Sequence, residues 1–188
     1  MAYLDDSLAQ LKIFEGIVPW MYLDTKGHVT VGVGEMLKTA ARAQSLGFVD
    51  RNNEPATADA ILADYHRVSA LPAAKGADFY RASTSPTLPP DTTDAILMQH
   101  LTFFDGRLNR RFANYATFPD PAKLGLLDMI YNLGVSGLFK GYPSFTSYVQ
   151  NQDWSNAATQ CHRHGPSAER NNWTKQQFLA AAEAAAVG

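Results

Sequence analysis

Apolar residues recur every three or four positions along most of this chain, as they do in amphipathic helices. The first such stretch, residues 3–14, is followed by Gly16, which is a typical helix stop signal. Another stretch, residues 58–71, follows Thr57, a favourable N-cap. Residues 72–90 are irregular, and we expect a loop interrupted by short structure. Further helices are predicted over residues 38–47, 91–115 and 120–134, and from Ser144, from Asp153, and from Ser167 or Thr174.

The pattern changes to alternation of apolar and small or polar residues between residues 20 and 34. A turn signal at residues 25–27 separates two such runs, which predicts a β-hairpin. One face of the second strand would carry Val29, Val31 and Val33, and the other His28, Thr30, Gly32 and Gly34. We expect the glycine-bearing face to be open to a ligand. The whole pattern predicts a mostly helical α+β domain with one small sheet.

Composition and charge exclude several classes of protein. The 188 residues are 46% hydrophobic and 18% charged, which suits one globular domain. A net charge of −2 without a basic run argues against nucleic-acid binding. No apolar run has the length of a membrane span, and the first residues lack the build of a signal peptide. We therefore expect a protein made in the cytoplasm, or exported without a cleaved signal, that does not insert into membranes.

The residues that commonly bind metals or form disulfides are scattered. Cys161 is the single cysteine, and its position in a helical pattern indicates a core thiol. The histidines are isolated, and only His162 and His164 are close in sequence, at a spacing that sends them to different faces of a helix. No carboxylate or cysteine cluster completes a ligand set. We predict no metal and no cofactor.

Two carboxylates frame the predicted hairpin: Glu15 precedes it and Asp24 lies at its turn. Cleavage of a glycosidic bond needs such a pair, one to protonate the leaving oxygen and one to activate water or stabilise the cationic transition state. Most acidic residues, however, are solvated surface groups, so the pair alone is weak evidence.

The spacing of Glu15, Asp24 and Thr30 is Glu-x8-Asp-x5-Thr, and residues 27–34, GHVTVGVG, resemble the motif G-x-x-T-I-G-x-G. In both features the chain is similar to the phage-type lysozymes of glycoside hydrolase family 24, which include endolysins and are related to domains of bacteriocins and secreted antibacterial effectors. Similarity continues in LLDMIYNLG, in DWSNAATQCHRHG and in RNNW from Arg170. Residues 38–95 resemble the family poorly.

This resemblance implies a lysozyme-like fold: a hairpin lobe at about residues 15–60, a helical lobe at about 91–188 with the N-terminal helix, and a cleft between them. It implies hydrolysis of the β-1,4 bond between N-acetylmuramic acid and N-acetylglucosamine in peptidoglycan. Glu15 would be the general acid, while Asp24 and Thr30 would hold the attacking water. A water between separated carboxylates predicts inversion at the anomeric carbon, whereas a close pair of carboxylates predicts retention.

The resemblance also implies residues that support catalysis and bind the substrate. Arg170 would lie beside Glu15, and Asn132 would supply an amide. The substrate contacts would be Gly34, Met36, Tyr131 and Ser144. Four of the assigned residues also have a structural explanation. Thr30 is a common strand residue, Arg170 and Asn132 suit helix ends, and an aromatic such as Tyr131 is more often core.

Glu35 is a departure from the family, whose members carry a histidine there; it removes an ion pair between elements and adds a third carboxylate near the cleft. The acidic net charge is also unlike that of most wall-degrading enzymes. We expect a monomer that degrades thin Gram-negative peptidoglycan. It would act in the periplasm, which it would reach after pore release or secretion. An immunity or inhibitor protein is a possible partner. Two other functions stay open: a lytic transglycosylase, and a non-catalytic peptidoglycan-binding module.

Overall fold

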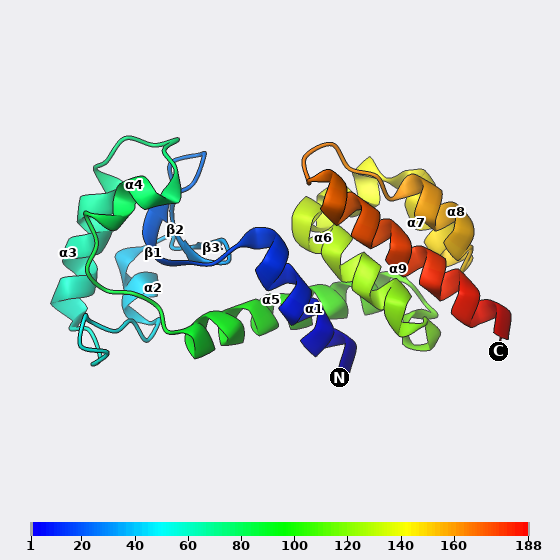
Figure 1. The fold of residues 1–188 in the computed structure, drawn as a ribbon, viewed down its shortest axis with the longest axis horizontal. Helices are drawn as coiled ribbons and strands as arrows, with labels where there is room; N and C mark the ends of the chain where they lie inside the picture. Colours follow the sequence, from blue (N-terminus) through cyan, green and yellow to red (C-terminus); the bar gives the residue numbers. More distant parts are fainter. Residues whose placement is uncertain (1, 188) are drawn as a thin grey trace. The chain divides into compact units, whose positions relative to one another are not determined.

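The computed structural model describes residues 2–187, which form two compact units (Figure 1). We call residues 15–97 the sheet unit, and residues 2–14 together with 98–187 the helical unit. The expectation of a mostly helical α+β chain with one small sheet is confirmed.

Caps and glycines explain where several helices begin and end. Thr57 caps α3 through a bond from Ala60 N, and Asp153 caps α8 through a bond from Asn156 N, as predicted. The sequence predicted that a helix ends at Gly134. The structure has a kink there, and the helix then resumes, so that α6 ends at Gly141. The elements are α1 Ala2–Glu15, β1 Val18–Leu23, β2 Val29–Gly32, β3 Glu35–Met36, α2 Ala40–Gln44, α3 Ala58–Ser69, α4 Ala77–Arg81, α5 Pro90–Arg111, η1 Tyr115–Thr117, α6 Asp120–Gly141, α7 Pro143–Gln150, α8 Trp154–Gln160 and α9 Ala168–Val187. None of the helices over residues 2–187 is long and apolar enough to cross a membrane.

The sheet unit contains the predicted hairpin and one further strand. β1, β2 and β3 form an antiparallel sheet in that order. Tyr22 pairs with Thr30, and Thr30 pairs with Met36, so these three side chains share one face. A tight turn joins β2 to β3, with Gly32 and Gly34 at φ of 67° and 93°. Because glycine alone adopts such angles without strain, these two residues are what allows the third strand.

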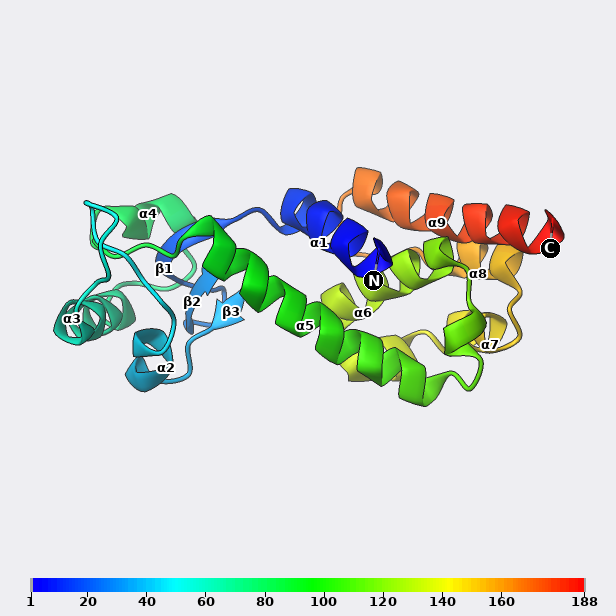
Figure 2. The same ribbon diagram turned by 90° about the horizontal axis from the view of Figure 1, so that it is seen from below.

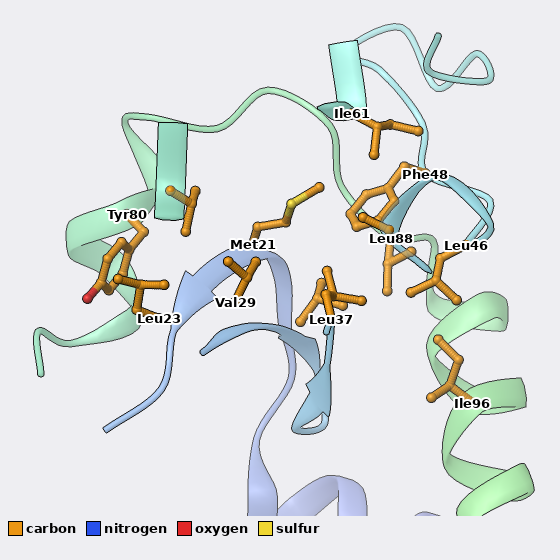
Figure 3. Packing of buried hydrophobic residues seen from close by; sticks show 13 residues of the cluster. Met21, Leu23, Val29, Leu37, Leu46, Phe48, Ile61, Tyr80, Leu88 and Ile96 are labelled. Atoms are coloured by element: carbon orange, nitrogen blue, oxygen red, sulfur yellow. The ribbon is translucent and has the colours of Figure 1, made fainter. Parts of the chain in front are cut away.

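The other face of the sheet covers the core of this unit (Figure 3). Met21, Leu23, Val29, Val31 and Leu37 belong to this buried cluster, together with Phe48, Ile61, Tyr80, Leu88 and Ile96. The prediction that Gly32 leaves its face open to a ligand is wrong. Gly32 is buried, and a Cβ there would lie 3.5 Å from Thr93 Cγ2 and 3.9 Å from Leu88 Cδ1. The glycine allows close packing within the protein instead.

In the helical unit, α9 packs along α6 and α8 (Figures 1 and 2). Phe178 of α9 is fully buried, and its ring meets that of Phe145 at 5.2 Å. Gly125 of α6 provides the space for this ring, because a Cβ at residue 125 would lie 2.7 Å from Phe178 Cζ. The contact between α6 and α9 therefore depends on a residue without a side chain.

Replacing Gly125 by alanine should lower the free energy of unfolding by about 1–3 kcal/mol, because the added methyl group collides with a buried ring. Urea unfolding measures the change. Gly106, inside α5, is the matched control: a Cβ there meets no atom within 4 Å. Gly106→Ala should raise stability by about 0.5–1 kcal/mol, since alanine favours helices. Equal effects of the two substitutions would contradict the packing explanation.

Candidate functional site

Glu15 is placed by the end of a helix. It is the last residue of α1, and Gly16, with φ of 69°, turns the chain toward β1. The Glu15 side chain is exposed. A carboxyl group at this point is accessible to a large substrate.

Asp24 is held by the hairpin turn that follows β1. Its Oδ1 accepts hydrogen bonds from Lys26 N and His28 N, both at 2.8 Å, and its Oδ2 lies 3.3 Å from His28 Nδ1. Burial acts to raise the pKa of Asp24, but the bonds from the His28 and Lys26 backbones, and then the His28 ring, outweigh it and leave the pKa below its usual value. Asp24 is therefore ionised at neutral pH. Because Oδ1 already has two donors, Oδ2 is the oxygen better able to bind a further group.

Thr30 lies on β2 and is only 3% exposed. Its hydroxyl donates to the carbonyl oxygen of His28 at 3.1 Å. The hydroxyl proton is thus used, and the oxygen retains the ability to accept a bond. A water that donated one proton to Thr30 Oγ1 and the other to the Asp24 carboxylate would keep its lone pairs free for attack.

Tyr22 is a site residue that the sequence predictions missed. It shares a sheet face with Thr30 and is half-buried. Its pKa is raised by burial, then by the charge of Asp24, and then by that of Glu15. The negative charges of both carboxylates thus contribute to the raised pKa of one phenol group. The alternation of β1 carried the signal, since Tyr22 is two residues before Asp24 and thus on the same side of an extended strand.

The titration of Tyr22 tests this arrangement without any assay of activity. We expect ¹³C NMR of the tyrosine ring to show a pKa for Tyr22 above the ordinary value, with the signal assigned by its loss in Tyr22→Phe. Asp24→Asn should lower this pKa more than Glu15→Gln does, because the Asp24 charge has the larger effect. A Tyr22 pKa that neither substitution changes would show that the carboxylates are not its neighbours.

Gly34 and Met36 follow Thr30 along the chain, Gly34 in the turn after β2 and Met36 in β3. Gly34 is exposed in the turn between β2 and β3, and Met36 is 39% exposed on the same sheet face as Thr30. Met36 and His28 also line a pocket of about 360 Å³. The other residues that line it are Gly27, Val29, Leu37, Lys38, Tyr65 and Ser69. This volume falls within the usual range of ligand sites.

Glu35 differs from its expected role. It pairs with Val31 across the strands, so it belongs to the opposite face of the sheet from Thr30. Its Oε1 accepts two bonds from Arg42 of α2, at 3.0 Å from Nε and 2.8 Å from Nη2. Glu35 thus forms an ion pair of its own between β3 and α2.

Four of the predicted site residues belong to the helical unit. Asn132 is exposed on α6, and the half-buried Tyr131 has ring contacts with Phe104 and His100 at 6.0 and 6.4 Å. Ser144, exposed at the start of α7, lines a pocket of about 260 Å³. Arg170 is buried on α9. Arg170 and Glu15 belong to different units, and their pairing stays a prediction.

Arg170 is part of a buried polar network that the sequence predictions also missed. Asp128 Oδ1 accepts from Arg170 Nε at 2.7 Å, and Oδ2 accepts from Arg163 Nη2 and Thr174 Oγ1, each at 2.6 Å. Asp128, Arg163 and Thr174 are each at most 1% exposed. The network fixes the guanidinium group of Arg170 in a defined orientation.

Among residues 2–187, no three His, Cys, Asp or Glu side chains are grouped so that they could hold a metal ion. Cys161 is buried, as predicted, and burial raises the pKa of its thiol to about 11. It is therefore a protonated core residue at neutral pH.

Comparison with known proteins does not assign the chain to a family. No family model matches it, and no curated protein is significantly similar to it.

Proposed function

We propose that this protein is a muramidase, which hydrolyses the β-1,4 bond between N-acetylmuramic acid and N-acetylglucosamine. One observation carries the proposal: Asp24 and Thr30 are both hydrogen-bonded to His28, and Thr30 pairs with Tyr22, whose pKa is raised by burial and then by the charges of Asp24 and Glu15. Glu15, Asp24 and Thr30 belong to the same unit, which also holds a pocket lined by His28 and Met36. These groups match the needs of acid-assisted attack by water on a glycosidic bond.

Each group has one role in this proposal. Glu15, exposed at the helix end, donates a proton to the leaving oxygen. Asp24, ionised because the turn stabilises its charge, accepts a proton from the attacking water. Thr30 accepts the second bond from this water, while Met36 gives apolar contact to a sugar face. With a water between the two carboxylates, the product has the inverted configuration.

The proposal includes a lysozyme-like fold in which Arg170 orients Glu15. Asn132, Tyr131 and Ser144, which belong to the helical unit, would contact the glycan. The fixed orientation of Arg170 by Asp128 supports this role. The site of action would be the periplasm of Gram-negative cells.

Product analysis tests the proposal. Purified protein is incubated with Gram-negative sacculi, and the released muropeptides are examined by mass spectrometry. Reducing N-acetylmuramic acid ends are expected. Anhydro ends would instead show a lytic transglycosylase, and binding to sacculi without any release would show a non-catalytic module. Equal activity on intact Gram-positive walls would contradict the predicted preference for thin peptidoglycan.

A further inference from the structure

A further hollow, unrelated to the proposed catalytic residues, lies in the helical unit. Its volume is about 530 Å³, which is ample for a ligand. Two helices form it, the last turns of α5 and the part of α6 that follows the Gly134 kink. Its lining residues are Arg107, Arg110, Arg111, Val135, Ser136, Phe139 and Lys140. We call this hollow the basic cleft.

The basic cleft concentrates positive charge in an acidic protein. The helical unit has nine Lys and Arg residues against eight Asp and Glu, whereas the sheet unit has seven against ten. Four of the nine cations line the cleft, and no carboxylate does. Within the described part of the chain, residues 2–187, none of these four forms an ion pair. The cleft is thus a local attractant for anions.

Apolar groups accompany these cations. Arg111 lies over the ring of Phe139, with Cζ 5.2 Å from its centroid, and Arg107 lies over Phe103 at 4.9 Å. Phe103 is 50% exposed and Val135 is 36% exposed. A simple inorganic anion would use the charges but leave these apolar surfaces in water. An anion joined to an apolar body would cover both.

Helix electrostatics explains only part of this arrangement. Arg110 and Arg111 are in the last turn of α5, and Lys140 is in the last turn of α6, where cations are favoured by the helix dipole. Arg107 lies one turn earlier. The dipole accounts neither for Arg107 nor for the exposed Phe103 and Val135.

We propose that the basic cleft binds the phosphate headgroup of an anionic lipid and attaches the protein to a membrane surface. The guanidinium groups would bind phosphate oxygens, for which arginine offers pairs of donors. Phe139 and Val135 would contact the first carbons of the acyl chains. Binding at this surface requires no helix that crosses the membrane. The proposal does not depend on the muramidase function.

Co-sedimentation with vesicles tests the proposal. The wild-type protein should bind vesicles of phosphatidylglycerol and phosphatidylcholine, and should not bind vesicles of phosphatidylcholine alone. The triple variant Arg107→Gln/Arg111→Gln/Lys140→Gln should bind about 100-fold more weakly, since each cation contributes roughly a factor of five near an anionic surface. The control Arg51→Gln/Lys75→Gln/Lys175→Gln removes the same charge from exposed positions elsewhere and should bind within about threefold of wild type.

A second variant tests the cleft in case the triple variant does not fold. Ser136→Glu places a negative charge at an exposed position of the cleft, and it should weaken vesicle binding while the thermal unfolding midpoint stays that of wild type. Absence of wild-type binding, or equal losses in the cleft and control triples, would overturn the proposal. Competition by inorganic phosphate at concentrations that leave the ionic strength unchanged would also overturn it, because the site would then recognise a free anion.

Discussion

Replacing Glu15 by glutamine should lower the rate of glycan cleavage by about 10²–10⁴-fold, the usual contribution of a general acid. Glutamine has almost the shape of glutamate but has no acidic proton to give to the leaving oxygen. Because Glu15 is exposed at the end of α1, the free energy of unfolding should change by less than about 1 kcal/mol. The release of reducing ends from sacculi measures the rate, and urea unfolding measures the stability.

Glu183 provides the matched control for this substitution. It is an exposed glutamate on α9, and Glu183→Gln makes the same chemical change away from the proposed site. This variant should cleave glycan at the wild-type rate. If Glu15→Gln retained more than about a tenth of the wild-type rate, Glu15 would not be the proton donor. Similar losses in both variants would point to a general effect of lost negative charge.

Much of the fold was predictable because its boundaries depend on local chemistry. Thr57, Asp153 and Gly16 act within a few residues of themselves, and each caps or ends a helix where the sequence placed it. Gly134 shows the limit of this reasoning. Its φ of 69° breaks the helical geometry, as a stop signal should, but the chain resumes a helix beyond it. Whether a helix resumes depends on packing of later residues such as the buried Leu138, which no local signal reports.

The candidate site shows the same division between local and long-range information. The turn at Asp24 is a short-range structure, so its hydrogen bonds could be expected from a hairpin. The pairing of Tyr22 with Thr30 follows from this turn through the regular pair of Leu23 and Val29, whereas the register of β1 shifts farther from the turn, between Val18 and Tyr22. Such an irregularity cannot be read from alternation alone. The face of Glu35 likewise follows from β3, a strand too short to leave a pattern.

The network around Asp128 could not be predicted from sequence patterns, for a different reason. Arg163 lies between His162 and His164, which are both exposed, and nothing in this polar stretch marks the arginine as buried. Its partner is 35 residues away. Buried charges of this kind are recognised only when the partners are known to meet, because an unpaired charge in the same place would be prohibitively costly.

Substitution of Asp128 by alanine should lower the free energy of unfolding by about 3–5 kcal/mol, which is a large part of the stability of a domain of this size. The change leaves the guanidinium groups of Arg163 and Arg170 buried without the carboxylate that now accepts from both. Thr174 Oγ1 also loses one of its two acceptors and keeps the carbonyl oxygen of Arg170. Asp128→Asn should cost less, since the amide oxygen can still accept a bond from one of the arginines. Urea unfolding at neutral pH gives both values.

Asp120 is the control, because it is also an aspartate of α6 that forms an ion pair, but at the surface. Its Oδ1 lies 3.8 Å from Lys123 Nζ, and its side chain is 61% exposed. Solvent screens such a pair, so Asp120→Ala should cost about 1 kcal/mol or less, including its effect at the start of the helix. If Asp128→Ala cost no more than Asp120→Ala, the buried network would not stabilise the helical unit. A larger loss in Asp128→Ala than in Asp120→Ala would show that this carboxylate stabilises the helical unit through its bonds with the two buried arginines.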